Sequence, residues 1–356
     1  MFGTFYLEDD YLTYSNKPWR RLSRSTSERP HGLDAHLIWS WWSVAISVRS
    51  LLRNIRLGGE PLDLDVTFGS GQIFGWRKMH GCWAGNIRGW PVTLKKEGDL
   101  LTVRSDSGLS LEEVAKFLHL DEDHLWLAER LRDEPRALEL LTSFKGMRIL
   151  RQDPWSCLIS YIVSSSLNIS VTEKALTMIS QLGKEKTLNG HRFWAIPDPE
   201  VLLNSPRPRK DFLGKKWYHI VLAAERAIDG RLDFEDLLRA TYERAWHDMV
   251  INQGTKIMGV GPKVADCVLL FSLDKMESFP MDRWVLRGLV QYFPDLIPEE
   301  IVGAVSSGMK SSLSVREYEK VSATVRARFG CSGGLLQECL FMRMRKLGWQ
   351  KPRASA

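Results

Sequence analysis

Two residues, Lys263 and Asp282, have types and a spacing that could do chemistry together. Lys263 follows the turn GVG at 259–261 and Pro262, and Asp282 lies nineteen positions later, after a Phe-Pro pair. At the start of a helix the macrodipole disfavours a cation, and burial would do the same, so we predict a neutral amine at Lys263. A neutral amine can act as a nucleophile, with Asp282 as its carboxylate partner. The alternative is a solvated surface lysine and an aspartate that only caps a helix.

Two helices joined by a glycine turn must position this pair. Gly259 and Gly261 interrupt the helical pattern of the preceding segment, and Pro262 suits the first position of a new helix. Such a hairpin directs free backbone N–H groups outward beside a helix N-terminus, where a phosphate can bind. Cys267 follows Lys263 by four positions and therefore shares its face of the helix. The apolar stripe predicted for this helix is Val264, Cys267, Val268 and Phe271.

Two kinds of pattern follow one another along the chain. Between Leu62 and Ser107, short aromatic and β-branched runs separated by glycine and aspartate predict an antiparallel sheet. These runs are LDVTF, QIFGWRKM, CWAGNIR, WPVTLK and LLTVRS. After Leu111 the apolar period becomes helical nearly to the end of the sequence. The pattern therefore predicts a small β region that leads into a larger helical region.

Local signals mark where two of these helices begin. Asp153 followed by Pro154 predicts an N-cap and the first residue of a helix. The residues that then share one face are Trp155, Leu158, Ile159 and Ile162. The sequence Ser-Val-Thr-Glu at 170–173 is typical of a capping box, and Gly183 is the predicted end of the helix that follows.

Composition limits the classes of protein to which the chain can belong. Its 356 residues are 44% hydrophobic and 26% charged, which predicts one or two globular domains. Lysine and arginine exceed aspartate and glutamate by 6 (49 against 43), which permits a polyanionic partner such as nucleic acid. The 5 cysteines form no C-x-x-C pair and no ligand set with histidine, so we expect no zinc or iron–sulfur site. Their odd, scattered count predicts an intracellular, reducing compartment.

The first 55 residues carry no sustained period. Their most apolar stretch, 37–48, is about half as long as the roughly 20 residues that a spanning helix needs. The segment also lacks the basic start and cleavage site of a signal peptide, so we expect neither secretion nor a membrane span. It is either a partner-binding or membrane-surface helix or a loosely ordered extension.

The stretch GVGPKVADCVLLFSLDK at 259–275, with FPMD ending at Asp282, resembles the helix-hairpin-helix, Gly/Pro-Asp signature of base-excision DNA glycosylases. It is most similar to the 8-oxoguanine DNA glycosylase family. Three further segments resemble that family: SGQIFGWR at 70–77 with the following CWAG, GMRILRQDPWSCLISYIVSS at 146–165, and FGCSGGLLQECLF at 329–341. Together they cover roughly residues 60–345.

This resemblance implies an α+β fold. An antiparallel β-sheet N-terminal domain, similar to the TATA-binding protein, would pack on a mostly α-helical helix-hairpin-helix glycosylase domain. The implied divisions are an N-terminal extension of unknown role at 1–55, the β-rich domain at 56–145, the helical domain at 146–346 and a tail at 347–356.

The resemblance also implies a bifunctional enzyme, a DNA glycosylase and abasic-site lyase that excises 8-oxoguanine. Lys263 would attack C1′ of the damaged nucleotide and form a Schiff base, while Asp282 would stabilise the positive charge that develops on the sugar. The extruded base would be bound by the Gly71 carbonyl, by Phe341 against its ring and by Gln337 at its Watson–Crick edge, with Cys267 on the opposite wall. Without the resemblance, Phe341 would be interpreted as a core aromatic.

The implied partner is double-stranded DNA containing oxidised guanine, bound by a monomer inside the cell without a cofactor or metal. The expected DNA contacts are Gly259, Gly261, Lys215, Lys216, Ser166 and Asn168. Further basic residues are candidates for phosphate contacts or belong to a solvated surface; they are Arg207, Arg209, Lys210 and those of RMRK at 343–346.

Two alternatives stay open. The first is a glycosylase of the same fold that removes another purine lesion, such as an alkylated base. The second is a non-catalytic helix-hairpin-helix module that binds DNA, in which Lys263 and Asp282 do no chemistry.

The chain departs from the family where the base opposite the lesion is read. Many members carry asparagine followed shortly by arginine where this chain has Ser166 and Val171, and a second arginine where it has Lys215 or Lys216. An ammonium cannot reproduce the planar, bidentate contacts of a guanidinium, so we predict a weaker preference for cytosine than typical members show. Cleavage of four duplexes that differ only in the base opposite the lesion tests this. Equal rates are expected, and a strong cytosine preference would contradict the prediction.

Overall fold

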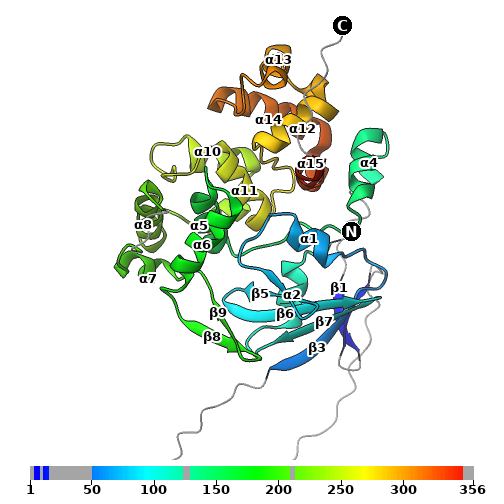
Figure 1. Ribbon diagram of the computed structural model, residues 1–356, viewed down its shortest axis with the longest axis vertical. Helices are drawn as coiled ribbons and strands as arrows, with labels where there is room; N and C mark the ends of the chain where they lie inside the picture. The colour runs from blue at the N-terminus through cyan, green and yellow to red at the C-terminus, as the bar shows by residue number, and fades with distance from the viewer. Residues whose placement is uncertain (1–3, 9–10, 16–49, 123–128, 209–212, 348–356) are drawn as a thin grey trace, which may run out of the picture.

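The computed structural model describes residues 4–8, 11–15, 50–122, 129–208 and 213–347. Within them a β-sheet forms one layer, and a larger group of helices lies on one side of it (Figure 1). In this view the sheet occupies the lower part of the molecule and most helices lie above it. The predicted α+β class, an antiparallel sheet packed on a mostly helical part, is confirmed.

Within the described residues, 7 strands form one sheet in the order β1-β2-β3-β7-β6-β5-β4. The neighbours from β3 to β4 all pair antiparallel, whereas β2 pairs parallel with β3. Burial alternates along β7, where Leu101 and Val103 are buried and Thr102 is partly exposed, as one packed face requires. The strands are β1 Thr4–Glu8, β2 Tyr11–Ser15, β3 Leu51–Arg56, β4 Arg77–Met79, β5 Cys82–Ile87, β6 Trp90–Glu97 and β7 Leu100–Ser105.

Two of the runs predicted as strands fold differently. LDVTF forms helix α1, Leu64–Gly69, because Asp63 caps it by accepting the N–H of Val66 at 2.9 Å, and Thr67 and Phe68 are buried on its inner face. Of QIFGWRKM only the last 3 residues form a strand, β4. Both predictions were wrong because a short apolar run between turn residues does not distinguish a strand from a short helix or a bent loop.

Three strands involve the segment that the sequence assigned to an N-terminal extension. Strands β1 and β2 lie within residues 1–55, and β3 crosses the expected boundary between residues 55 and 56. The apolar stretch 37–48 lies outside the described residues. Of the helices that the structure describes, none combines the length and the apolar character needed to cross a membrane.

Helices dominate the chain after residue 111. A strand hairpin that the sequence interpretation missed, β8 Glu185–Leu188 and β9 His191–Trp194, interrupts them. Its signal was the pair Asn189-Gly190, which adopts the left-handed backbone conformation (φ 52° and 76°) of a two-residue turn. The helices are α2 Leu111–Phe117, α4 Pro135–Ser143, α5 Pro154–Ser164, α6 Ile169–Ser180, α7 Pro199–Asn204, α8 Lys215–Ile228, α9 Phe234–Arg239, α10 Tyr242–Val250, α11 Pro262–Ser272, α12 Arg283–Tyr292, α13 Glu299–Ser307, α14 Val315–Phe329 and α15 Gly333–Leu347, with short 3-10 turns at Pro294–Leu296 and Gly330–Ser332.

The predicted start of α5 is confirmed. The Asp153 carboxylate accepts the N–H of Ser156 at 2.8 Å, and Pro154 is the first helical residue. The predicted inner face is buried along its whole length, at Trp155, Leu158, Ile159 and Ile162.

The predicted start of α6 is wrong. Asn168 caps the helix by accepting the N–H of Val171 at 2.9 Å, so Ser170 is already inside the helix and cannot serve as its cap. Two capping sequences overlap here, and the earlier one begins the helix. The helix ends at Ser180, and the N–H of Gly183 closes the next turn on the Ser180 carbonyl at 2.9 Å.

Two apolar cores lie on the two sides of the junction. One fills the space between the sheet, α1 and α2, and includes Leu94, Leu101 and Phe117. The other, larger core lies among the helices from α4 to α15. Helix α4 falls in the range expected for the β-rich domain, yet it packs on α15 and contributes Ala137 and Leu140 to the helical core.

Arg148 ties the segment that enters the helical part to the β part. Its guanidinium is fully buried and pairs with the Glu60 carboxylate at 2.8 Å. It also donates to the Pro61 and His119 carbonyls, each at 3.0 Å. A buried guanidinium needs such partners because desolvation of an unpaired charge costs several kcal/mol.

Glu60→Gln tests this junction. The substitution should lower the free energy of unfolding by about 3 kcal/mol, because it leaves the buried guanidinium without its carboxylate. Urea unfolding followed by circular dichroism measures the loss. Glu112→Gln is the matched control, since Glu112 pairs with Lys116 at 2.7 Å on an exposed helix face, and it should cost less than about 1 kcal/mol. Equal losses for both variants would contradict the assignment.

Candidate active site

Gly259 and Gly261 form the turn between α10 and α11, as the sequence predicted. Gly259 has a φ of 84°, and a Cβ atom there would lie 2.5 Å from Nδ1 of His219, so only glycine fits. Gly261 precedes α11 as its N-cap, and Pro262 is the first helical residue. The predicted stripe of Val264, Cys267, Val268 and Phe271 is buried. The turn therefore places Lys263 in the first turn of α11, where its backbone is held by the helix.

Lys263 is partly buried, and its ammonium lies 4.8 Å from the ring centroid of Tyr161 on α5. Burial works to lower the pKa of Lys263, but the neighbouring Cys267, Asp282 and Glu338 outweigh it and raise that pKa above its ordinary value. The prediction of a neutral amine is therefore wrong for the free protein. Cys267 and the two carboxyl groups together favour the cation more strongly than burial opposes it.

Cys267 lies beside Lys263 on α11 and is buried. Burial, only partly opposed by the neighbouring ammonium, raises the pKa of the Cys267 thiol to about 12. The side chain is thus a neutral thiol near neutral pH and contributes shape more than charge.

Asp282 is the N-cap of α12, as predicted. Its Oδ1 accepts the N–H groups of Trp284 at 2.8 Å and Val285 at 2.9 Å. The residue before it, Met281, donates its N–H to the Tyr318 hydroxyl at 3.0 Å. Both the cap and this contact fix the backbone that carries the carboxylate.

A buried polar network continues from Tyr318 into α11. The Tyr318 hydroxyl donates to Oδ2 of Asp266 at 2.6 Å, and Tyr242 and Ser278 donate to Oδ1 at 2.7 and 3.0 Å. Burial, against these hydrogen bonds, raises the pKa of Asp266 to about 6. Asp266 lies one turn of α11 from Lys263, so the same network positions both members of the pair.

The structure brings Gly71 together with Phe341, as the resemblance implied. Gly71 has a φ of 97°, and a Cβ atom there would lie 3.4 Å from Cε1 of Phe341 and 3.3 Å from Nη1 of Arg345. The guanidinium of Arg345 in turn lies 5.3 Å from the Phe341 ring centroid. Arg345 was expected only as a phosphate contact, and its place beside Gly71 was not foreseen.

Gln72 fixes the loop that carries Gly71. Its buried amide donates to the Arg148 carbonyl at 2.9 Å and accepts the N–H of Leu150 at 2.8 Å. Its own carbonyl accepts the Tyr161 hydroxyl at 2.9 Å. Tyr161 is the ring beneath Lys263, so one hydrogen bond and one cation–π contact connect the Gly71 loop to the lysine. Nothing in the local sequence distinguished Gln72 from a surface residue.

Gln337 and Glu338 are adjacent on α15, and each is only 3% exposed. Oε1 of Gln337 and Oε2 of Glu338 have no hydrogen-bond donor among the residues that the structure describes. Burial raises the pKa of Glu338 to about 7, with Asp282 adding to the rise and Lys263 opposing it. The sequence interpretation overlooked Glu338, whose only signal was a charged residue within the apolar run LLQECLF.

Two of the residues expected to contact DNA, Ser166 and Asn168, lie between α5 and α6. Ser166 is exposed and has a left-handed backbone conformation with a φ of 61°, and Asn168 caps α6. Lys216 is not free to contact DNA as expected. Its ammonium donates to the Val163 carbonyl at 2.7 Å and to the Ser165 carbonyl, both at the C-terminal end of α5.

Of the other basic residues considered as phosphate contacts, some make contacts within the protein and others are exposed. Arg343 pairs with Glu139 at 3.0 Å, and the Lys346 ammonium lies 4.9 Å from the Phe144 ring centroid. Lys215 is exposed at the first turn of α8. Arg209 and Lys210 lie outside the described residues.

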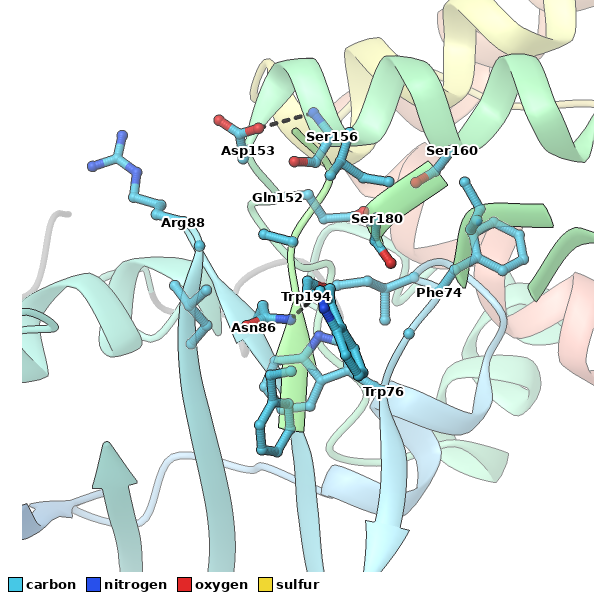
Figure 2. Close-up of a pocket in the computed structure, with 18 of the residues that line it drawn as sticks. Phe74, Trp76, Asn86, Arg88, Gln152, Asp153, Ser156, Ser160, Ser180 and Trp194 are labelled. Carbon is cyan, nitrogen blue, oxygen red and sulfur yellow. Dashed lines mark hydrogen bonds between the residues drawn. The ribbon is translucent and has the colours of Figure 1, made fainter. Parts of the chain in front are cut away.

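A cavity of about 300 Å³ lies apart from these residues, between β5, β9, α5 and α6 (Figure 2). Its lining includes Trp76, Trp194, Gln152 and Ser160, and neither Lys263 nor Asp282 lines it. Figure 2 shows Asn86 bonded to the Trp194 carbonyl across one wall. The chemistry-bearing residues are therefore arranged at another place, around Lys263.

The arrangement around Lys263 can support nucleophilic substitution at a cationic centre. An amine, two carboxyl groups and a glycine-bearing loop lie around one point, and the aromatic Phe341 lies beside that loop. A carboxylate near a developing oxocarbenium ion stabilises it, and an aromatic face can stack on a planar base.

Comparison with known proteins adds an independent observation. Residues 54–158 match the family model for the 8-oxoguanine DNA glycosylase N-terminal domain. An N-glycosylase/DNA lyase of Arabidopsis thaliana is 27% identical over 300 residues, which cover 81% of this chain and 79% of the relative. A probable N-glycosylase/DNA lyase of Methanothermobacter thermautotrophicus is 27% identical over 272 residues, covering 65% of this chain and 83% of the relative.

A solved structure gives the same likeness in three dimensions. The 8-oxoguanine glycosylase/lyase of Clostridium acetobutylicum, in complex with double-stranded DNA containing cytosine opposite 8-oxoguanine, matches with a TM-score of 0.70. The match covers 84% of this chain and 96% of that chain at 25% identity.

Two adjacent lysines allow a matched test of the α5 terminus. Lys216→Met should lower the free energy of unfolding by about 2 kcal/mol, because it removes a cation that binds otherwise unpaired helix carbonyls. Lys215→Met should leave stability unchanged, since Lys215 is exposed, and should weaken DNA binding if Lys215 contacts a phosphate as expected from the sequence. Thermal unfolding and fluorescence anisotropy with duplex DNA measure the two effects. A weaker DNA affinity without a stability loss in Lys216→Met would contradict the assignment.

Proposed function

Because the chain belongs to the 8-oxoguanine DNA glycosylase family, we propose that it excises 8-oxoguanine from duplex DNA and cleaves the strand at the resulting abasic site through Lys263. It is a bifunctional N-glycosylase and lyase that acts on double-stranded DNA containing oxidised guanine. The observation that carries the role of Lys263 is its position: its ammonium lies over Tyr161, next to Asp282 and to the loop of Gly71.

The reaction would begin with extrusion of the damaged nucleotide, since the glycosidic bond cannot be reached inside the base stack. The neutral amine of Lys263 attacks C1′ while the C1′–N9 bond breaks, and the base leaves with the bonding electron pair and takes up a proton. Asp282 stabilises the positive charge on the sugar. Opening of the sugar ring gives a protonated Schiff base, and loss of a C2′ proton then expels the 3′ phosphate by β-elimination.

Recognition of the lesion would rest on Gly71, Phe341 and Gln337. The Gly71 carbonyl would accept the N7–H that 8-oxoguanine has and guanine lacks, and the closeness of Gly71 to Phe341 supports this role. The unpartnered Oε1 of Gln337 supports a contact with the base, whose Watson–Crick edge carries N–H donors. Arg345, which lies on the Phe341 ring, must move or stack on the incoming base.

The contacts with the opposite strand would come from Ser166, Asn168 and Lys215, and the hairpin of Gly259 and Gly261 would bind a phosphate. The engagement of Lys216 with α5 supports a weak reading of the opposite base, because it leaves only Lys215 of the two lysines that could stand in for the arginine. An enzyme of this activity works where DNA is kept, so we expect it in the nucleoid-containing cytoplasm or in a nucleus.

Covalent trapping tests the proposed reaction. Borohydride should reduce the Schiff base and leave the protein attached to 8-oxoguanine DNA, and Lys263→Gln should lower this trapping to background while retaining DNA binding. Lys116→Gln, at an exposed site on α2, is the control and should trap like the parent protein.

The same assay separates the alternatives when undamaged and alkylated-purine duplexes are included. Trapping or base release only on the alkylated duplex would identify the other-lesion glycosylase. Tight DNA binding without trapping on any duplex would identify the non-catalytic binding module.

A further inference from the structure

Glu338 is a buried carboxyl group that the proposed chemistry leaves unused. It follows Gln337 on α15 and is 3% exposed. Its Oε2 is buried without a hydrogen-bond donor among the residues that the structure describes. Most buried carboxyl oxygens are hydrogen-bonded, so an unpartnered one that lies close enough to Lys263 to influence its charge calls for a functional explanation.

Several elements bring charged or titratable groups to Glu338. Helix α11 contributes Lys263, the start of α12 contributes Asp282, and α15 itself contributes Arg345. Burial raises the pKa of Glu338 to about 7 and Asp282 raises it further, while Ser70, Lys263 and Arg345 act in the opposite direction. The thiols of Cys267 and Cys339 and the hydroxyl of Tyr161 complete the titratable surroundings.

The need for a proton acceptor follows from the state of Lys263. Its pKa is raised in the free protein, so it carries a proton that must leave before the amine can attack C1′. Asp282 cannot take this proton and keep the negative charge that the proposed reaction requires opposite the sugar, and its Oδ1 already accepts two backbone N–H groups. An acceptor is most effective when its pKa lies near the working pH.

We propose that Glu338 accepts the proton of the Lys263 ammonium and thereby generates the nucleophilic amine inside the closed site. This inference rests on the proposed function. The two side chains, both within the described part of the chain, form no ion pair in the free protein, so the transfer takes place once bound substrate has drawn them together. In the step, one Nζ–H bond of Lys263 breaks and an O–H bond forms at Oε2 of Glu338, with no other bond changed. The protonated Glu338 contacts Ser70, which precedes Gly71, and so holds a proton on the side where the base departs with the C1′–N9 electron pair.

The proposal fixes the direction of the pH dependence. Below about pH 7 Glu338 is protonated and cannot accept a proton, so the single-turnover rate should fall as the pH decreases through that value. Above it Glu338 is ionised and the rate should level off. Without the carboxyl group, Lys263 must lose its proton to solvent, so the rate should keep rising with pH towards the pKa that the lysine has in the variant.

The test compares pH profiles of the full chain on 8-oxoguanine DNA, measured as single-turnover base release and as borohydride trapping. Glu338→Gln should be slower by about 100-fold near neutral pH and should lack the inflection near pH 7. Glu338→Asp, which keeps a carboxyl group, should retain an inflection. Glu112→Gln is the control at an exposed site and should match the parent protein.

The outcomes separate this inference from the proposed function. If the parent protein neither releases base nor traps, the proposed function fails. If the parent protein reacts but shows no inflection near pH 7, or if Glu338→Gln keeps it, the role of Glu338 is overturned. The profile of the parent protein gives this answer even if Glu338→Gln fails to fold.

The same variants on DNA that already contains an abasic site provide a second measurement. Schiff-base formation with the abasic aldehyde also needs the neutral amine of Lys263 but releases no base. Glu338→Gln should therefore slow trapping there with the same loss of the inflection. A defect confined to the base-containing substrate would assign Glu338 to base binding and would contradict proton transfer from the lysine.

Discussion

The hydrogen bonds of Gln72 are the constraint on which the arrangement of the site depends. The Gln72 side chain is 1% exposed, and its amide joins the loop of Gly71 to the backbone at Arg148 and Leu150. The backbone carbonyl of Gln72 accepts the hydroxyl of Tyr161. The two apolar cores meet at this point. The β-sheet part therefore holds Gly71, and the helical part holds Lys263, at fixed positions relative to each other. A loop held only by its own turn could not maintain that relation, because loops without packed partners are mobile.

Charge, more than burial, sets the state of the central lysine. A first-turn position and desolvation were expected to leave Lys263 neutral. Cys267 on the same helix, with Asp282 and Glu338 from two other helices, reverses the outcome and raises the pKa of Lys263. The free protein thus holds its nucleophile as a stable ion within a cluster of carboxyl groups. The reactive form has to be produced when substrate is bound, which limits reaction with other electrophiles.

How much could be predicted from the sequence depended on how far apart the interacting residues lie along the chain. The caps at Asp153 and Asp282 and the burial of α11 depend on neighbours within one or two turns, so their patterns were sufficient. The family resemblance located Gly71 and Phe341 before the structure joined them. The roles of Gln72, Glu338 and Lys216 depend on partners more than fifty residues away, and no local pattern contains that information. Even within a few residues of sequence, both Asn168 and Ser170 were possible caps of α6, and Asn168 is the one that caps it.

Lys216 has a consequence for how this protein could change its selectivity. Its ammonium binds the last carbonyls of α5, the helix that leads directly to Ser166 and Asn168. Exchange of this lysine for an arginine would place a planar guanidinium where a compact ammonium now binds two carbonyls. A guanidinium at position 216 would therefore disturb the helix end that leads to Ser166 and Asn168, whereas the exposed Lys215 does not share that constraint. An arginine can be introduced at position 215 without loss of the contacts at the end of α5, but at position 216 only together with a substitution that supports this helix end.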